Sequence, residues 1–314
     1  MKNLRALAAF AALTVNTILW CMPLFVLALV KLLLPVPALR RAMTRSLMWI
    51  GESWVSGNAL ILGLGPARVE VRGAGGLNRR GWYLVISNHR TWVDIVVLQT
   101  VFNRRIPFLK FFIKQELVWF PFLGLAWWAL DMPFMKRHSK SYLAKHPEKK
   151  GEDLRATRAA CEKFRDAPTS VINFVEGTRY TEEKRAKRAS PYRHLLPPRA
   201  GGVALALTSM GSMFDAILDV TLVYVRERIT FWDLCRGELD GVVVDIEQRA
   251  VEPWMSQGDY AEDREFRAAF HRWLSGIWHE KDAKIGAMRN ARNSRGASVT
   301  MPGVSTTAGD RHAH

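Results

Sequence analysis

A long apolar stretch occupies the N-terminal part of the chain. No charged residue occurs from Ala6 to Val30, a length that can span the hydrocarbon core of a bilayer. The stretch is too long for the apolar region of a signal peptide, and no small-x-small cleavage site follows it, so an uncleaved anchor is favoured over a cleaved signal. From Met43 to Gly65 the chain is again apolar but contains Glu52 and several glycines, which predicts a helix in the membrane interface or against the domain.

After residue 65, short apolar runs alternate with polar turns. Segments of strand length alternate with segments of helical length, which predicts an α/β fold, a mostly parallel sheet flanked by helices. Ligand sites in such sheets lie beyond the carboxyl ends of the strands. The predicted strands are Val69–Val71, Trp82–Ser87, Pro107–Ile113, Asp131–Met135, Val171–Val175, Ile217–Val225 and Val242–Ile246, and the predicted helices are Thr91–Phe102, Asp153–Arg165 and Gly202–Met210.

These patterns divide the chain into three parts. We expect an N-terminal membrane anchor with its basic flank over residues 1–45 and a globular domain over residues 46–285. Residues 286–314 lose large apolar side chains and end in Ser, Thr, Gly, Arg and His, which predicts a disordered tail.

A basic excess adds a constraint on partners. Lys and Arg number 45 against 29 Asp and Glu, a net charge of +16, which favours a phospholipid surface, a phosphorylated substrate or nucleic acid. Basic residues are also more numerous after the apolar stretch than before it, so the positive-inside bias places the rest of the chain in the cytoplasm. The three cysteines are scattered without metal-ligand spacing, as expected of reduced thiols facing the cytosol.

The first motif with chemical potential follows the predicted strand Trp82–Ser87. It reads Ser-Asn-His-Arg-Thr-Trp-Val-Asp, and a histidine near an aspartate can act as a general base. His89 and Asp94 can meet only if His89 lies in a turn and Asp94 in the first turn of a helix, because residues five apart diverge on a helix. Thr91 and Asp94 also fit a capping box, in which Asp94 merely accepts backbone N–H groups. This motif alone leaves both interpretations open.

The second motif, Val-Glu-Gly-Thr-Arg, follows the predicted strand Val171–Val175. Gly177 permits a tight turn and close backbone approach. Arg179 offers a planar guanidinium suited to bidentate phosphate binding. The alternative is a surface turn in which Glu176 and Arg179 pair with each other in solvent.

Between these motifs lies a basic and then strongly apolar element. Lys114 precedes the uncharged stretch Leu117–Leu130, which is rich in tryptophan and phenylalanine and too short for a comfortable span. It is either core or a platform at the membrane interface, and tryptophans beside lysines favour the interface.

In this order, the motifs resemble the lysophospholipid acyltransferase superfamily, in particular the lysophosphatidic acid acyltransferases. The resemblance covers roughly Trp82 to Val225. Its blocks are Asn-His-x4-Asp at 88–94, Lys114, Phe-Met-Lys-Arg at 134–137 and Glu-Gly-Thr-Arg at 176–179. The segments at 119–124, 129–137, 194–198 and 219–222 look like one membrane-bound bacterial branch of the family.

The resemblance implies a glycerolphosphate acyltransferase-like fold and a role for each matching residue. His89 would be the general base and Asp94 its partner, and Arg137 and Arg179 would contact the acceptor's phosphate. Further implied substrate-binding residues are Lys114, Glu176, Gly177 and Thr178. The family's fourth block often ends in proline, which the nearest stretch, Val220–Val225, lacks, so no site residue is assigned there.

The implied reaction moves an acyl group from an acyl thioester, acyl-CoA or acyl carrier protein, to the sn-2 hydroxyl of lysophosphatidic acid, giving phosphatidic acid in phospholipid biosynthesis. No metal or other cofactor is expected, and the implied location is the cell inner membrane with the catalytic domain facing the cytoplasm. Other acceptors, such as another lysophospholipid or glycerol 3-phosphate, remain alternatives, as does an inactive membrane scaffold. A basic, non-enzymatic membrane or nucleic-acid binder is a further alternative, although no nucleic-acid motif is recognised and no nucleic-acid partner is expected.

Overall fold

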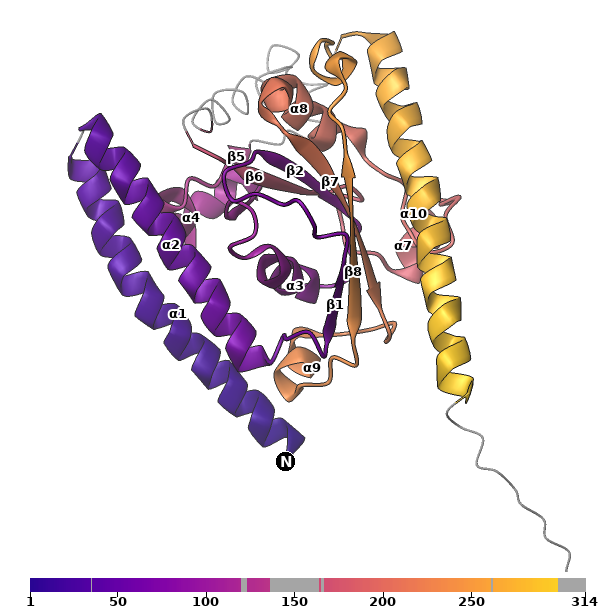
Figure 1. The fold of residues 1–314 in the computed structure, drawn as a ribbon, viewed down its shortest axis with the longest axis horizontal. Helices are drawn as coiled ribbons and strands as arrows, with labels where there is room; N and C mark the ends of the chain where they lie inside the picture. The colour runs from indigo at the N-terminus through magenta and orange to yellow at the C-terminus, as the bar shows by residue number, and fades with distance from the viewer. Residues whose placement is uncertain (35, 120–122, 136–163, 165–166, 261, 299–314) are drawn as a thin grey trace, which may run out of the picture.

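The computed structural model describes residues 1–34, 36–119, 123–135, 164, 167–260 and 262–298. Its centre is a six-stranded sheet in the order β1-β8-β7-β2-β6-β3 (Figure 1). All neighbouring strands run parallel except β7 and β8, which are antiparallel. The strands are β1 (Val69–Arg72), β2 (Tyr83–Ser87), β3 (Leu109–Phe111), β6 (Ser170–Phe174), β7 (Ala216–Tyr224) and β8 (Val242–Arg249), and a separate pair is formed by β4 (Ile113–Lys114) and β5 (Phe134–Met135).

The central strands are continuous apolar runs because helices cover both faces of the sheet. Every residue of β2 is buried, and β2 lies between β7 and β6, parallel to both. Ser87 at the end of β2 is level with Phe174, the last residue of β6. The loops that follow these two strands, which carry the two motifs, therefore leave the same edge of the sheet.

Different helices cover the two faces (Figure 1). One face packs against α3 (Val93–Phe102), with contributions from α9 (Phe231–Arg236) and the ends of the N-terminal hairpin. The other packs against α8 (Ala200–Met210) and α10 (Arg264–Ser298). We call these the hairpin face and the α8–α10 face. The remaining short elements are η1 (Gln115–Trp119), α4 (Leu123–Ala129), α7 (Glu182–Lys187), η3 (Gly211–Met213) and η4 (Pro253–Ser256).

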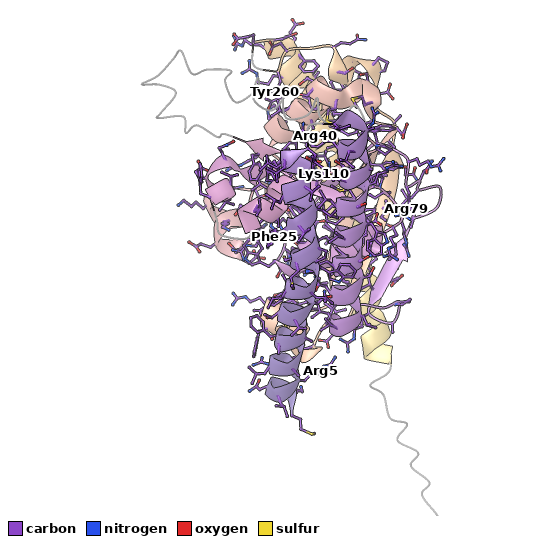
Figure 2. The ribbon with its side chains drawn as sticks, turned by 90° about the vertical axis from the view of Figure 1, so that its left-hand side faces the viewer. Arg5, Phe25, Arg40, Arg79, Lys110 and Tyr260 are labelled. Atoms are coloured by element: carbon purple, nitrogen blue, oxygen red, sulfur yellow. The ribbon has the colours of Figure 1, made fainter. Side chains whose placement is uncertain are left out.

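The N-terminal hairpin consists of α1 (Lys2–Leu33) and α2 (Pro37–Leu62), seen from outside in Figure 2. Within the described residues, α1 is the one helix long and apolar enough to cross a membrane. A partly buried polar contact joins the two helices, since the Asn16 amide donates to Asn58 Oδ1 and to the Trp54 carbonyl, both at 3.0 Å. The hairpin is thus a packed pair of helices.

Both ends of α1 also contact the globular domain. Lys2 Nζ lies 3.0 Å from Glu238 Oε1 near one end. Near the other end, Lys31 Nζ lies 2.9 Å from Asp131 Oδ2. An upright span of α1 would require at least one of these contacts to open, because both partners belong to the same domain.

The outer side of the hairpin exposes an apolar stripe. Its residues recur every three or four positions along α1, which is one face of a helix. The stripe consists of Leu4, Leu7, Phe10, Val15, Ile18, Leu19, Met22, Val26, Leu29, Leu32 and Leu33. The other exposed large apolar residues after the hairpin are Trp92, Leu117, Trp119, Leu125, Trp128, Val225 and Phe231, so within the described residues none lies on α7, α8 or α10.

The predicted fold class is confirmed, with two differences in detail. The segment Pro107–Ile113 divides into β3 and β4, and the predicted 43–65 helix begins earlier, at Pro37, and packs against the domain. The boundary placed at residue 45 therefore falls inside α2. The predicted helix Asp153–Arg165 lies, apart from Phe164, outside the described residues.

The C-terminal part departs most from the prediction. Helix α10 was not predicted, and it runs to Ser298, so the disordered tail predicted from residue 286 is wrong for 286–298. Residues 299–314 lie outside the described part of the chain. The buried side chains Phe270, Leu274 and Trp278 recur every four positions and hold α10 on the sheet.

Candidate active site

His89 and Asp94 meet at the carboxyl end of the sheet. His89 lies in the turn after β2, and Asp94 lies in the first turn of α3, the arrangement that the spacing requires. The distance from His89 Nδ1 to Asp94 Oδ2 is 2.8 Å. Because a carboxylate oxygen accepts, Nδ1 carries the proton and Nε2 keeps a free lone pair. The His89 imidazole can therefore take a proton from a hydroxyl placed at Nε2.

Asp94 makes the contacts that each of its two interpretations requires of the carboxylate. Its Oδ2 accepts the backbone N–H of Thr91 at 3.0 Å and of Arg90 at 2.6 Å, which is the carboxylate half of a capping box. The same oxygen accepts the His89 imidazole, and the carboxylate is fully buried. The backbone donors thus orient the carboxylate that holds the histidine.

Tyr224 is a residue of the site that the sequence did not reveal. It is the last residue of β7, and its hydroxyl donates to Asp94 Oδ1 at 2.6 Å. Burial and the neighbouring carboxylate of Asp94 raise the pKa of Tyr224 well above its usual value, which keeps the phenol a hydrogen-bond donor. In the sequence, the only indication of this role is a tyrosine at the end of a buried strand. Which residue its hydroxyl contacts depends on the strand order, which the sequence does not give.

Two neighbours fix the turn that carries His89. The imidazole stacks on Phe174 with ring centres 4.0 Å apart and planes 16° from parallel. Asn88 is buried and exchanges two hydrogen bonds with the Leu222 backbone, donating to its carbonyl at 3.0 Å and accepting from its N–H at 2.8 Å. The turn is therefore fastened to both strands that flank β2.

The Glu176 side chain joins the turn that carries His89 to the loop that carries Leu196. Its Oε1 accepts the His89 N–H and its Oε2 accepts the Leu196 N–H, both at 2.9 Å. Burial raises the pKa of Glu176 to about 7, because the charged form is poorly solvated. Both carboxylate oxygens accept backbone N–H groups, so Glu176 positions the His89 turn, and its implied role in substrate binding stays a prediction.

The rest of the second motif forms an exposed turn. Gly177 has a φ of 66°, in the left-handed region that favours glycine. Thr178 Oγ1 accepts a hydrogen bond from Lys184 Nζ at 3.0 Å. The Arg179 guanidinium lies over the Trp92 ring, 5.0 Å from its centre, and is exposed. The predicted alternative, a Glu176–Arg179 pair in solvent, is therefore wrong, and the fork of Arg179 faces outward.

The two remaining predicted basic residues are described only in part or not at all. Lys114 lies in β4, where its backbone pairs with Met135 of β5. Arg137 lies two residues beyond β5, outside the described residues. Their participation in the site stays a prediction.

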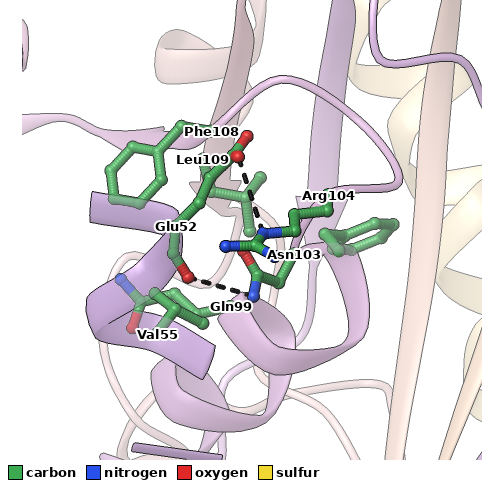
Figure 3. A pocket seen from close by; sticks show the side chains of 8 residues that line it. Glu52, Val55, Gln99, Asn103, Arg104, Phe108 and Leu109 are labelled. Carbon is green, nitrogen blue, oxygen red and sulfur yellow. Dashed lines mark hydrogen bonds and ion pairs between the residues drawn. The ribbon is translucent and has the colours of Figure 1, made fainter. Parts of the chain in front are cut away.

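Within the described residues, no group of three or more His, Cys, Asp or Glu side chains is arranged to hold a metal ion. A small cavity between α2 and α3, lined by Glu52, Gln99 and Asn103 among others, is drawn in Figure 3. Its volume is about 10 Å³, near the minimum for one water molecule, and none of the residues of the His89 site lines it.

The parts define a class of chemistry. A histidine with a buried carboxylate partner can activate a hydroxyl, and an exposed arginine can bind an anionic group. This arrangement on an α/β fold suits an enzyme that uses a histidine–aspartate pair on an anionic substrate.

Comparison with known proteins identifies the family. The family model described as Acyltransferase matches residues 68–225, which contain both motifs, and the chain belongs to this family. The 1-acyl-sn-glycerol-3-phosphate acyltransferase delta of Homo sapiens is 26% identical over 214 residues, covering 64% of this chain and 51% of that protein. The 1-acyl-sn-glycerol-3-phosphate acyltransferase 3 of Arabidopsis thaliana is 29% identical over 153 residues, covering 44% of this chain and 37% of that protein.

The fold also has a relative among solved structures. The crystal structure of the 1-acyl-sn-glycerophosphate (LPA) acyltransferase PlsC from Thermotoga maritima superposes with a TM-score of 0.50 at 16% identity, covering 90% of this chain and 98% of that one. The chain spans about half the length of the first curated relatives that it matches.

Proposed function

We propose that this chain is a 1-acyl-sn-glycerol-3-phosphate acyltransferase that acylates the sn-2 hydroxyl of lysophosphatidic acid to give phosphatidic acid. The observation that carries the proposal is the His89–Asp94 pair beside the outward-facing Arg179, inside the region that matches the family model. The names of the relatives support the same acceptor.

The reaction follows from the geometry of His89. Its Nε2 removes the proton of the acceptor hydroxyl while that oxygen attacks the thioester carbonyl. Asp94 holds the imidazole in orientation and stabilises the imidazolium that forms. Collapse of the tetrahedral intermediate breaks the carbon–sulfur bond, and the His89 imidazolium returns its proton to the leaving thiolate, which gives the thiol and restores the neutral base. The donor is an acyl thioester, acyl-CoA or acyl carrier protein.

Arg179 would orient the acceptor. Its fork can bind two phosphate oxygens, and the Trp92 ring beneath it limits its motion. Fixing the phosphate places the hydroxyl of the same small molecule near His89. Arg137 and Lys114 are proposed to add contacts to this phosphate, on the resemblance alone.

The hairpin would deliver the acceptor from a membrane. Its apolar stripe suits lipid, and the contacts of both ends of α1 with the domain favour a hairpin seated in one leaflet over an upright span. We propose the cell inner membrane, with the catalytic domain on the cytoplasmic side, following the basic residues after α1. The exposed Trp119 and Trp128 would lie at the same interface.

The test uses the purified full-length protein in mixed micelles with a panel of lysophospholipids, glycerol 3-phosphate and acyl thioesters, the products being identified by mass. We expect phosphatidic acid from lysophosphatidic acid as the main product. His89→Ala and Asp94→Asn should each lower kcat by about 10³-fold or more while the protein stays folded. His271→Ala, an exposed histidine on α10, is the matched control and should keep the activity.

Three outcomes would contradict the assignment. Near-normal turnover of folded His89→Ala would remove the general base. A main product from glycerol 3-phosphate or from a lysophospholipid with a headgroup would keep the chemistry and change the acceptor. A nucleic-acid binder would instead show nuclease-sensitive pelleting and no thiol release.

A further inference from the structure

Two further arginines contact the Gly177 turn. The Arg188 guanidinium donates to the Glu176 carbonyl through Nη1 at 3.2 Å. The Arg199 side chain lies over Gly177, where a Cβ would come within 3.0 Å of Arg199 Cδ. Arg188 is half-buried and Arg199 is exposed. One turn therefore carries two guanidinium groups.

The positive charge of this pair is not neutralised nearby. Within the described residues, no carboxylate oxygen lies within 4.0 Å of a nitrogen of Arg188 or Arg199. Burial and the neighbouring charge of Arg199 lower the pKa of Arg188. The carboxylate of Glu176 accepts hydrogen bonds from two backbone N–H groups. Two neighbouring guanidinium groups that pair with no described carboxylate fit an anionic ligand.

The pair lies on the α8–α10 face. Arg199 is the residue that precedes α8, whereas Arg179 covers Trp92 at the start of α3, on the hairpin face. Within the described residues, the exposed large apolar side chains lie on the hairpin face and its neighbours, not on α7, α8 or α10. The exposed apolar residues of the hairpin face suit the approach of a lipid, and the polar surface of the α8–α10 face suits the approach of a water-soluble substrate.

We propose that Arg188 and Arg199 bind the phosphate of the phosphopantetheine arm of the acyl donor. This group is common to acyl-CoA and to acyl carrier protein, and it lies at the opposite end of the arm from the thioester. The inference rests on the proposed function, since it assigns the second phosphorylated substrate of that reaction. Glu176 joins the two sites, because its side chain contacts His89 and its carbonyl contacts Arg188.

Two basic sites for two phosphates solve a problem of this reaction. Acceptor and donor both carry phosphate, and a single basic pocket would bind either one unproductively. Two separate basic groups on one turn avoid this competition. Arg179 would bind the phosphate of the acceptor, and the Arg188–Arg199 pair would bind the phosphate of the donor.

The experiment compares donors that differ at one group. Initial rates are measured for the full-length protein with acyl-pantetheine, acyl-phosphopantetheine, acyl-CoA and acyl carrier protein at saturating lysophosphatidic acid. Arg188→Ala and Arg199→Ala should raise the donor KM about tenfold to a hundredfold for the three phosphate-bearing donors. The rate with acyl-pantetheine, which lacks the phosphate, should change by less than about threefold and so reports correct folding. Lysine at either position should recover part of the loss, because it keeps the charge without the fork.

Two control variants test whether the effect on the donor KM is specific to Arg188 and Arg199. Lys187→Ala removes an exposed positive charge one residue from Arg188 and should leave every donor KM unchanged. Arg179→Ala should raise the acceptor KM instead. A loss confined to acyl-CoA would place a nucleotide phosphate at the pair, and a loss confined to acyl carrier protein would place an acidic protein surface there. Either result would overturn the phosphopantetheine assignment.

Failure of this proposal differs from failure of the proposed function. Binding of phosphopantetheine, measured by calorimetry without acceptor, should weaken by the same factor in Arg188→Ala and Arg199→Ala. If the wild-type protein transfers no acyl group but binds phosphopantetheine through these arginines, the function is wrong and the site stands. If acyl transfer is normal and both variants keep the wild-type KM for every donor, or raise only the acceptor KM, the site is wrong.

Discussion

The hairpin face and the α8–α10 face leave different side chains exposed. On α1, Leu19 is 60% exposed and Ile18 57% exposed, and neighbouring positions of the stripe are similar. On α10 the large apolar residues are turned inward, and Trp278 is fully buried. The contrast supports a different solvent for each face, because soluble proteins rarely expose so large a contiguous apolar patch to water.

The two faces also bury charge differently. Under α10, Lys281 and Asp219 are both buried, with Lys281 Nζ 2.6 Å from Asp219 Oδ1 and Arg249 Nε 3.1 Å from Asp219 Oδ2. The directed hydrogen bonds of Lys281 go to the Val220 carbonyl and Thr221 Oγ1. On the hairpin face, the Lys31 side chain is 13% exposed and the Asp131 side chain, its partner, is 25% exposed. The first cluster fixes α10 on the sheet, whereas the second is partly solvated.

Of the substitutions that test this contrast, Lys281→Met should have the largest effect on stability. The variant keeps the aliphatic stem but leaves Asp219 with Arg249 alone, so we expect a loss of about 3 kcal/mol in the free energy of unfolding. Lys31→Met, the matched change on the hairpin face, should cost about 1 kcal/mol or less. Denaturant unfolding in detergent measures both. Equal losses would show that the two faces do not differ in this way.

The sequence predicts the sheet well because each central strand is recognisable from its own run of apolar residues. β2 and β7 are nearly continuous apolar runs, and the motifs that follow β2 and β6 meet as expected from parallel strands. Helix α10 was missed although Phe270, Leu274 and Trp278 keep helical spacing, because Lys281 continues the buried side of the helix with a charge. A buried lysine is recognisable only once its partner Asp219 is known.

The contacts of the candidate site also differ in whether the sequence predicts them. The His89–Asp94 contact is local, five residues apart, so turn and helix geometry predict it. The contact of Tyr224 with Asp94 joins residues 130 positions apart and depends on the order of β2 and β7, which no local pattern contains. The pair Arg188 and Arg199 likewise becomes visible only when both reach the Gly177 turn.

Ala11→Glu and Ala283→Glu compare the outer surfaces directly. Both alanines are exposed on long helices, but Ala11 lies within the apolar stripe of α1 and Ala283 lies on α10. A carboxylate forced into lipid should weaken vesicle binding by about 2 kcal/mol, roughly thirtyfold, for Ala11→Glu. Ala283→Glu should change it less than about twofold. Vesicle flotation over a range of lipid concentrations measures the difference, and equal effects would remove the hairpin face from the membrane.

The smallest expected effect concerns Tyr224, which lies between the two faces at the end of β7. Tyr224→Phe removes the one described hydrogen bond to Asp94 Oδ1, so the carboxylate is oriented by its other donors alone and holds His89 less rigidly. We expect kcat to fall about tenfold with little change in either KM.

Initial rates and thermal unfolding, measured on the same preparations, separate this role from a structural one. A purely structural role would lower stability and leave the kcat of the folded protein unchanged. Tyr83→Phe is the matched control, since the buried Tyr83 hydroxyl accepts from the Asn78 N–H at 3.0 Å away from the site, and it should leave kcat unchanged. An unchanged kcat in folded Tyr224→Phe would mean that the backbone donors of Arg90 and Thr91 suffice to orient Asp94.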